Sequence, residues 1–421
     1  MRDKVARTPS HPEGPPPQAP DFPALDEPPE FRLLDHDGSD VEMPSPLEDY
    51  THGMSLPRYE DVPPGAPGCQ RCEVLPRLLR GPGTFRLRLG FTHTLGKVLH
   101  YLQGTSWEHS EHNGTVSVRV PEGSLAPLVS PLMDLMSIME QDFARATFQF
   151  DGDSELDAAN ESISLKTFNV KARSAWLLEI LRENRLYSIF QPIVKCFPRA
   201  AAPELFGFEC LARAEVDGQT AMPGTMFDLA RRAELLFQLD LAARSAAIRA
   251  AAAAGISAKV FINFSPNSIY NPLRCLASTV RLVDQVGLRR DQVVFEIVEG
   301  DRLPEMKQLQ RIVATYRNEG FQVALDDVGS GYATMQVLVA LRPEYVKIDM
   351  DLVRNVHVDP DRAVVTGKLL EMVQELGLRT IAEGVETTGE LDWLRAHGAD
   401  YLQGYLFARP ARTPPPVQWQ P

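Results

Sequence analysis

The sequence has few cysteines, no long apolar run and no excess of positive charge. Its five cysteines are an odd number, which argues against a disulfide framework and favours a reducing environment. No apolar run approaches the roughly 18 residues of a membrane span, and residues 1–10 lack the apolar core of a signal peptide. We therefore expect a soluble, cytoplasmic protein without a membrane partner.

The charge balance is acidic. Lys and Arg number 43 against 56 Asp and Glu, which gives a net charge of -13. Proteins that bind DNA or RNA neutralise phosphates with clustered cations, so this balance disfavours nucleic-acid partners. A small phosphorylated ligand is compatible with the composition if cations are concentrated locally. At 421 residues with 44% hydrophobic content, the chain is long enough for two or three domains.

Proline is concentrated at the N-terminus, where residues 1–82 hold half of the chain's 34 prolines. Such a segment cannot bury enough apolar surface to offset its chain entropy, so we predict a disordered tail. Cys69 and Cys72 have the spacing of half a zinc site or of a redox pair, but no second CxxC follows. The histidines that could complete a ligand set are His93, His100, His109 and His112, although residues 109–114 read equally well as a polar turn.

Residues 84–152 predict a small α/β domain, which we interpret as an input or regulatory domain. Residues 85–89, 116–120 and 146–150 alternate with period two, and residues 125–143 carry apolar side chains at helical spacing. The acidic, turn-rich segment that follows indicates a linker over residues 153–169.

From residue 170 to 412, short apolar strands alternate with longer helical segments. The predicted strands are residues 188–194, 205–214, 259–263, 293–298, 322–326, 345–349, 380–383 and 401–405. Eight strands separated by helices fit a closed, TIM-like (β/α)8 barrel better than an open sheet. Several of the intervening helices end at a glycine suited to a C-terminal cap, namely Gly255, Gly320, Gly377 and Gly398.

Ionisable residues at the carboxyl ends of barrel strands are typical of catalytic sites. The predicted strand ends carry Glu209, Asn263, Glu296, Asp326, Asp327, Lys347, Glu383 and Gln403. This set is rich in oxygen ligands and contains no histidine, so it favours Mg²⁺ or Mn²⁺ over zinc. Several carboxylates at one barrel mouth would repel one another unless cations compensated them. We therefore expect bound divalent metal, with more than one ion.

Asp326 and Asp327 are adjacent, and adjacent residues on a regular strand face opposite ways. Both reach one site only if the strand ends between them, and residues 329–331 supply two glycines for that bend. Two ions about 4 Å apart, bridged by Asp326, would activate a water for in-line attack on a phosphodiester. Lys347 would hold that water or the developing charge, and Glu383 would act as the base.

Glu209 and Arg213 lie four residues apart on one predicted strand, so they share a face. Taken alone, this pair reads as a surface ion pair. Beside the other strand ends, Arg213 would instead bind a substrate phosphate through two parallel hydrogen bonds from its guanidinium.

These residues lie in an ordered series of short motifs. The series comprises Gln191-Pro192-Ile193-Val194, Glu209-Cys210-Leu211-Ala212-Arg213, Ile262-Asn263-Phe264-Ser265, Glu296-Ile297-Val298-Glu299, Asp326 to Tyr332, Lys347-Ile348-Asp349, Ala382-Glu383-Gly384-Val385-Glu386 and Gln403-Gly404-Tyr405. It resembles the EAL-domain cyclic di-GMP phosphodiesterases, whose signature is Glu-Ala-Leu-x-Arg. The resemblance implies a TIM-like barrel that hydrolyses cyclic di-GMP to linear pGpG with two Mg²⁺ or Mn²⁺ ions per site.

The resemblance also implies a role for individual residues. The metal ligands fall on Glu209, Asn263, Glu296, Asp326 and Asp327. Catalytic roles fall on Lys347, Glu383 and Glu209, and substrate contacts on Gln191, Arg213 and Gln403. Glu299 and Glu386 match positions that support the site. A homodimer formed through the barrel is implied as well.

Two positions depart from the family pattern. Cys210 replaces the alanine of the signature and should face away from the ligands. Val328 replaces the usual phenylalanine of a loop that couples metal binding to dimerisation, so we expect it to affect rate and regulation more than chemistry. No Gly-Gly-Asp/Glu-Glu-Phe cyclase motif is present, which argues against synthesis of the dinucleotide. The alternative function is a receptor that binds cyclic di-GMP without hydrolysing it, although such receptors usually lose metal ligands and none is lost here.

Overall fold

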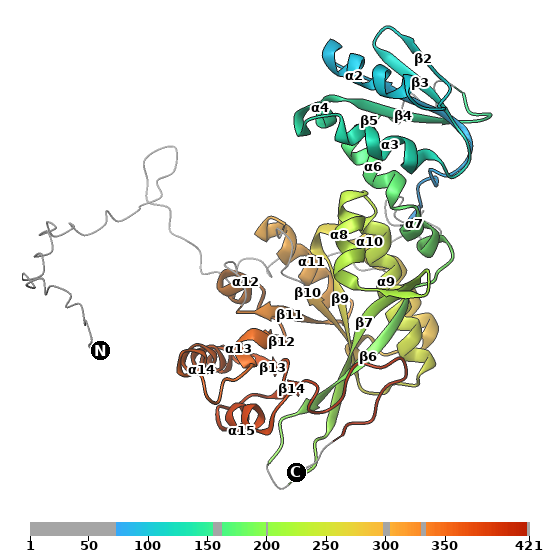
Figure 1. Ribbon diagram of the computed structural model, residues 1–421. Helices are drawn as coiled ribbons and strands as arrows, with labels where there is room; N and C mark the ends of the chain where they lie inside the picture. The colour runs from blue at the N-terminus through green and yellow to red at the C-terminus, as the bar shows by residue number, and fades with distance from the viewer. Residues whose placement is uncertain (1–72, 155–161, 199–200, 298–303, 330–333, 419–421) are drawn as a thin grey trace, which may run out of the picture. The chain divides into compact units, whose positions relative to one another are not determined.

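The computed structural model describes residues 73–154, 162–198, 201–297, 304–329 and 334–418, and these form two β-sheets with their helices (Figure 1). Nearly all of the predicted tail lies outside the described residues, and so do Cys69, Cys72 and Glu299. Among the described residues, no helix combines the length and the hydrophobicity needed to cross a membrane.

The smaller sheet is antiparallel and has the strand order β2-β3-β1-β4-β5. Its elements are β1 (Gly83–Arg88), α2 (Thr92–Gln103), β2 (His109–His112), β3 (Thr115–Val120), α3 (Leu125–Asp134), α4 (Ile138–Phe143), β4 (Arg145–Phe150), β5 (Ile163–Ser164) and α6 (Leu165–Arg173). Phe85 and Leu87 alternate along the central strand β1 and are fully buried, as period-two spacing predicts. The order of strands and helices is that of a split βαβ fold.

The sequence pattern missed parts of this unit. Helix α2 and strand β2 were not predicted, and residues 109–114 form a β-strand followed by a tight turn at Asn113 and Gly114, whose φ values are 49° and 76°. The single helix expected over residues 125–143 is two helices, because the chain breaks before α4 at Ser137.

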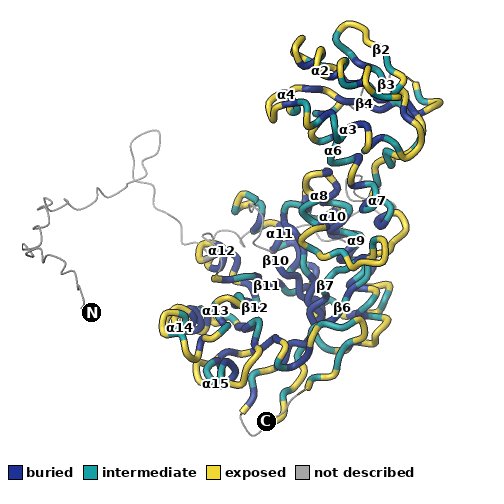
Figure 2. The backbone as a smooth tube through the Cα atoms, viewed as in Figure 1, coloured by how far each residue is buried: buried dark blue, intermediate teal, exposed yellow. Residues whose placement is uncertain are grey.

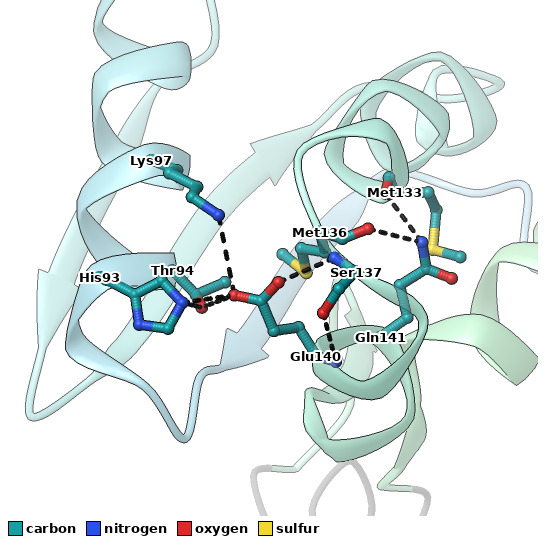
Figure 3. Close-up of polar contacts among 8 residues, drawn as sticks. All are labelled: His93, Thr94, Lys97, Met133, Met136, Ser137, Glu140 and Gln141. Atoms are coloured by element: carbon teal, nitrogen blue, oxygen red, sulfur yellow. Dashed lines mark hydrogen bonds and ion pairs between the residues drawn. The ribbon is translucent and has the colours of Figure 1, made fainter.

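Glu140 explains where α4 begins (Figure 3). Its carboxylate accepts the backbone N–H of Ser137 at 2.8 Å, while the Ser137 hydroxyl accepts the N–H of Glu140, which completes a capping box. The same carboxylate accepts the Thr94 hydroxyl and lies 2.8 Å from Nε2 of His93, both on α2. The Thr94 hydroxyl and the cap bonds lower the pKa of Glu140 to about 2.

The larger sheet is the predicted closed barrel of eight strands. They are β6 (Tyr187–Lys195), β7 (Leu205–Val216), β9 (Lys259–Phe264), β10 (Val293–Ile297), β11 (Gln322–Val328), β12 (Tyr345–Ile348), β13 (Arg379–Ala382) and β14 (Tyr401–Gln403). The barrel closes because β6 pairs with both β7 and β14. A short additional strand, β8 (Gln219–Ala221), extends β7 as a hairpin.

One strand runs against the others. Strands β7 and β9 to β14 are parallel to one another, whereas β6 is antiparallel to both β7 and β14. The expectation of a helix after every strand is therefore wrong for the first connection. Only residues 196–204 separate β6 from β7, which is too short for a parallel crossover through a helix.

Helices lie around the outside of the barrel (Figure 1). They are α7 (Ala175–Arg182), α8 (Pro223–Arg232), α9 (Leu236–Ala253), α10 (Pro272–Val286), α11 (Met306–Asn318), α12 (Thr334–Leu341), α13 (Met350–Val353), α14 (Pro360–Glu375) and α15 (Thr388–Ala396), with short 3₁₀ turns η2 (Pro266–Ser268) and η3 (Arg290–Gln292). The four glycines predicted to end helices all have left-handed φ values between 64° and 87°.

The strands carry two apolar layers, and Figure 2 shows buried segments concentrated along them. Outward-facing side chains such as Phe295 and Leu325 pack against the helices in the main core. Inward-facing side chains fill the barrel as a separate cluster, which we call the inner core. It contains Ile193, Phe261, Val294, Ala324, Tyr345, Ile381 and Tyr401, with the partly buried Phe206 packed against them.

A candidate metal and catalytic site at the carboxyl ends of the strands

A polar layer lies directly above the inner core. Side chains alternate along a strand, so a residue two positions beyond an inner-core residue also faces the barrel interior. Those positions hold Asn263, Glu296, Asp326, Lys347, Glu383 and Gln403; Glu209 follows Gly207 in the same way, and Gln191 precedes Ile193 because β6 is reversed. The predicted strand-end residues therefore share one face of the barrel.

Lys347 lies at the centre of this layer and is 1% exposed. Its Nζ is 2.6 Å from Oε1 of Glu383, 2.9 Å from Oε1 of Glu296, 2.9 Å from Oδ1 of Asp326 and 3.6 Å from Oε2 of Glu209. Burial lowers the pKa of Lys347, but the four carboxylates outweigh it and raise that pKa well above its ordinary value. Lys347 is therefore a fixed cation among four acids.

Glu209 differs from the other acids because two amides hold it. Nδ2 of Asn263 donates to Oε1 at 2.9 Å, and Nε2 of Gln403 donates to Oε2 at 2.6 Å. Burial raises the pKa of Glu209, but Lys347 and these two amides lower it by more, so the net shift is downward. Gln403 Nε2 also lies 3.2 Å from Oε1 of Gln191, which links β14 to β6.

The remaining acids are poorly compensated. Burial is the first cause that raises the pKa of Glu296, Asp326 and Glu383, and repulsion among the carboxylates adds to it. Apart from their ion pairs with Lys347, both oxygens of Glu296 and Oδ1 of Asp326 find no hydrogen-bond donor in the part of the chain that the structure describes. Buried oxygens that lack donors fit a divalent cation, because hard cations take carboxylate and amide oxygens as ligands.

Asp327 reaches the same site by a route that the sequence did not predict. Strand β11 continues through Val328 instead of ending between the two aspartates, and a β-bulge interrupts its pairing with β12 after Leu325. Asp327 adopts a left-handed φ of 54° within this bulge. Oxygens of Asp326, Asp327 and Glu383 consequently lie within 4.8 Å of one another, and burial together with Asp326 raises the pKa of Asp327 to about 7.

The other predicted residues differ in their surroundings. Arg213 is half-buried and its Nη1 donates to the backbone carbonyl of Ala212 at 2.8 Å; burial lowers its pKa. Glu386 is exposed and lies 3.4 Å from Nη2 of Arg354. Cys210 packs in the main core outside the barrel, away from Glu209, as predicted, and burial raises the pKa of its thiol.

Asp349 is an acid to which sequence reasoning gave no role. It raises the pKa of Asp327, and its carboxylate accepts the N–H of Asp351 at 2.6 Å at the start of α13. The signal was its position two residues after Lys347, which puts both on the same face of an extended chain.

Comparisons with known proteins agree with this arrangement. The model of the EAL domain family matches residues 174–410. The chain is 29% identical over 249 residues to the probable cyclic di-GMP phosphodiesterase PdeG of Escherichia coli K12, covering 56% of this chain and 48% of that protein. The chain spans about half the length of the curated relatives it matches.

Solved structures show the same likeness. The cyclic di-GMP-bound form of a standalone EAL protein from Vibrio cholerae O395 is 35% identical, covering 55% of this chain and 95% of that one, with a TM-score of 0.50. BlrP1 of Klebsiella pneumoniae, solved as a calcium and cyclic di-GMP complex, is 21% identical and covers 80% of this chain and 98% of that one, with a TM-score of 0.51; this likeness concerns the fold alone.

Proposed function

Because the chain belongs to the EAL domain family, we propose that it hydrolyses cyclic di-GMP to linear pGpG in a reaction that depends on Mg²⁺ or Mn²⁺. The observation that carries the proposal is the cluster around Lys347, where four carboxylates at the carboxyl ends of four strands share one ammonium. The names of the relatives and the cyclic di-GMP bound to the Vibrio protein support this choice of substrate.

We propose that two cations are held by Glu209, Asn263, Glu296, Asp326 and Asp327, with Glu383 close enough to join them. Such ions would polarise the phosphodiester and make a bound water acidic enough to attack at neutral pH. Glu209 suits a ligand because its amide partners favour the ionised form. Asp326, Asp327 and Glu383 suit ligands because their oxygens already converge.

Separate residues of the protein would then transfer the proton, balance the developing charge and bind the substrate. Glu383 takes the proton of the attacking water, since its carboxylate oxygen lies beside those of Asp326 and Asp327, where that water would be bound. The Lys347 ammonium balances the negative charge that develops as the bond from phosphorus to the 3′ oxygen breaks. Arg213 binds a substrate phosphate. Gln191 and Gln403 lie beside the substrate, and Gln403 also donates to Glu209. Glu299 and Glu386 would support the loops around the site.

We also propose an organisation for the whole chain. The unit from β1 to α6 acts as an input domain, which places β5 and α6, predicted as part of the linker over residues 153–169, inside that domain; the barrel forms a homodimer in the cytoplasm. Exposed apolar side chains on α12 and around α14, including Met335, Val339, Val364 and Val365, supply surface for such an interface. Sedimentation of the purified chain at several concentrations tests the dimer, and a monomer at all of them would contradict it.

Hydrolysis is tested by incubating the full-length protein with cyclic di-GMP and Mg²⁺ or Mn²⁺ and following pGpG by chromatography. Glu209→Gln should abolish turnover. Cys210→Ala is the matched control, because Cys210 is adjacent in sequence and faces the opposite side of β7, and it should keep activity within about twofold. Binding of cyclic di-GMP without product would instead support the receptor function, and neither binding nor product would contradict both.

A further inference from the structure

Helix α9 carries a buried ion pair that the proposed reaction does not use. Asp240 is 0% exposed and Arg244 is 1% exposed, and Nη2 of Arg244 lies 2.9 Å from Oδ2 of Asp240. Both residues lie outside the barrel interior, on a helix that packs against β6, β7 and β9. Burying two charges carries a desolvation penalty for each ion, which only good geometry and further hydrogen bonds offset. Their other contacts therefore show what the pair holds in place.

Asp240 holds the turn that follows β9. Its Oδ1 accepts the backbone N–H of Ser265 at 2.9 Å, and its Oδ2 accepts the hydroxyl of Ser268 at 2.7 Å. The Ser268 hydroxyl lies in addition 2.7 Å from the carbonyl of Ser265, so the turn is closed on itself. Ser265 is only two residues beyond Asn263, whose amide donates to Glu209. The Asp240 carboxylate thus fixes the backbone that carries Asn263.

Arg244 fixes Asp240 in turn. Its Nη1 donates to the hydroxyl of Thr279 on α10 at 3.0 Å, and the hydroxyl of Tyr316 on α11 lies 3.4 Å away. Thr279 and Tyr316 are 1% and 0% exposed, so this end of the network is as closed to water as the ion pair. Three helices are therefore joined, through one guanidinium and one carboxylate, to a single turn at the edge of the polar layer.

We propose that Asp240 and Arg244 are positioning residues for the metal site, acting through the Ser265–Ser268 turn to orient the amide of Asn263. The inference rests on the proposed function, because it assigns Asn263 to a cation. Since Nδ2 of Asn263 donates to Glu209, its carbonyl oxygen is the atom left for a metal. A shift of the turn would move that oxygen and release Glu209 together. Groups that orient metal ligands typically contribute 10- to 100-fold to affinity.

The experiment measures Mn²⁺ binding by the full-length protein from the electron paramagnetic resonance signal of the free ion, with no substrate present. Asp240→Asn keeps one acceptor for Ser265 but gives up the charge opposite Arg244, and we expect Mn²⁺ affinity to fall by about tenfold or more. Ser268→Ala removes the hydroxyl's contacts with Asp240 and with the carbonyl of Ser265 but leaves both charges paired, and we expect Mn²⁺ affinity to fall by about threefold. This second variant keeps the test decisive if Asp240→Asn does not fold.

Glu344→Gln is the matched control. Glu344 accepts the N–H of Val323 at 2.8 Å and Nε of Arg317 at 2.8 Å, the same kinds of partner that Asp240 has, but at the amino ends of β11 and β12. It should lower the melting temperature and leave Mn²⁺ affinity within twofold. Hydrogen exchange of a peptide spanning residues 263–268 should accelerate in Asp240→Asn and stay unchanged in Glu344→Gln.

The outcomes separate the two proposals. Wild-type affinity in Asp240→Asn and Ser268→Ala, with melting temperatures lowered as in Glu344→Gln, would show that the pair is only structural and would overturn the positioning role. A wild-type protein that binds no Mn²⁺ would refute the proposed metal site, and the positioning role with it. Weakened binding together with faster exchange in the two variants alone would support the inference.

Discussion

Replacement of Lys347 by Met tests whether this ammonium offsets the buried acids. Three carboxylate oxygens lie 2.6–2.9 Å from Nζ. At an effective dielectric constant of 20, each contact corresponds to about 6 kcal/mol of attraction. Protonation of the acids and relaxation recover most of that sum, and removal of one partner from a buried ion pair typically costs about 3–5 kcal/mol. We expect Lys347→Met to lower the free energy of unfolding by about that amount without metal.

The assay is urea unfolding of the full-length protein in EDTA and again in Mn²⁺. Bound cations would compensate the carboxylates in place of Lys347, so the difference between variant and wild type should shrink in Mn²⁺. In Mn²⁺, turnover of Lys347→Met should be lower than that of wild type by about 100-fold or more, because the charge that balances the leaving oxygen is lost.

Lys259→Met is the control for Lys347→Met. Lys259 lies at the amino end of β9, where its Nζ bonds the carbonyl of Asp291 and Oε1 of Gln322. Lys259→Met should lower the free energy of unfolding by less than Lys347→Met does, and by the same amount in EDTA and in Mn²⁺. Equal stability of Lys347→Met and wild type in EDTA would refute the reasoning, and a deficit that Mn²⁺ does not reduce would contradict a cation in this site.

Three further predictions follow from single contacts. Arg213→Ala should raise KM for cyclic di-GMP by tenfold or more with a smaller effect on kcat, whereas Glu209→Gln should remove turnover; steady-state kinetics separate them. Glu140 has a folded pKa of about 2 against an ordinary 4.5, so its stabilising contribution is present above pH 4.5 and is lost as pH falls towards 2. The melting temperature should therefore change less between pH 5 and pH 3 in Glu140→Gln than in wild type. Gly404→Ala would place Cβ 2.0 Å from the carbonyl oxygen of Val385, so urea unfolding should show a loss of about 1–3 kcal/mol.

The barrel and most of its polar layer could be predicted because both depend on local patterns. Each parallel strand is a short apolar run followed by a polar residue, and period-two alternation carries that residue to the face of the inner core. Phe261 and Asn263 on β9, or Tyr345 and Lys347 on β12, show the relation directly. Once the strands are assigned, their positions therefore determine which polar residues face the barrel interior.

What could not be predicted depends on backbone detail and on contacts between distant residues. No local pattern distinguishes a strand that ends after Asp326 from one that bulges at Asp327, because both let the two side chains converge. The direction of β6 follows from the length of one connection and not from the strand itself. The network that leads from Thr279 and Tyr316 through Arg244 and Asp240 to the turn after Asn263 joins three helices, and its members carry no shared motif.

The inner core also determines from which side a ligand approaches. Phe206 stacks on Tyr401 with ring centroids 3.8 Å apart, and Phe261 meets Tyr345 edge to face at 5.5 Å, directly beneath the polar layer. These rings fill the barrel towards the amino ends of the strands, where Phe261 is 0% and Tyr345 is 2% exposed. Ions or a substrate bound by the polar layer would therefore enter from the carboxyl ends, past the turns that follow the strands. The positions of those turns decide access as well as ligand geometry, which is why a residue such as Asp240, outside the barrel, can control a site inside it.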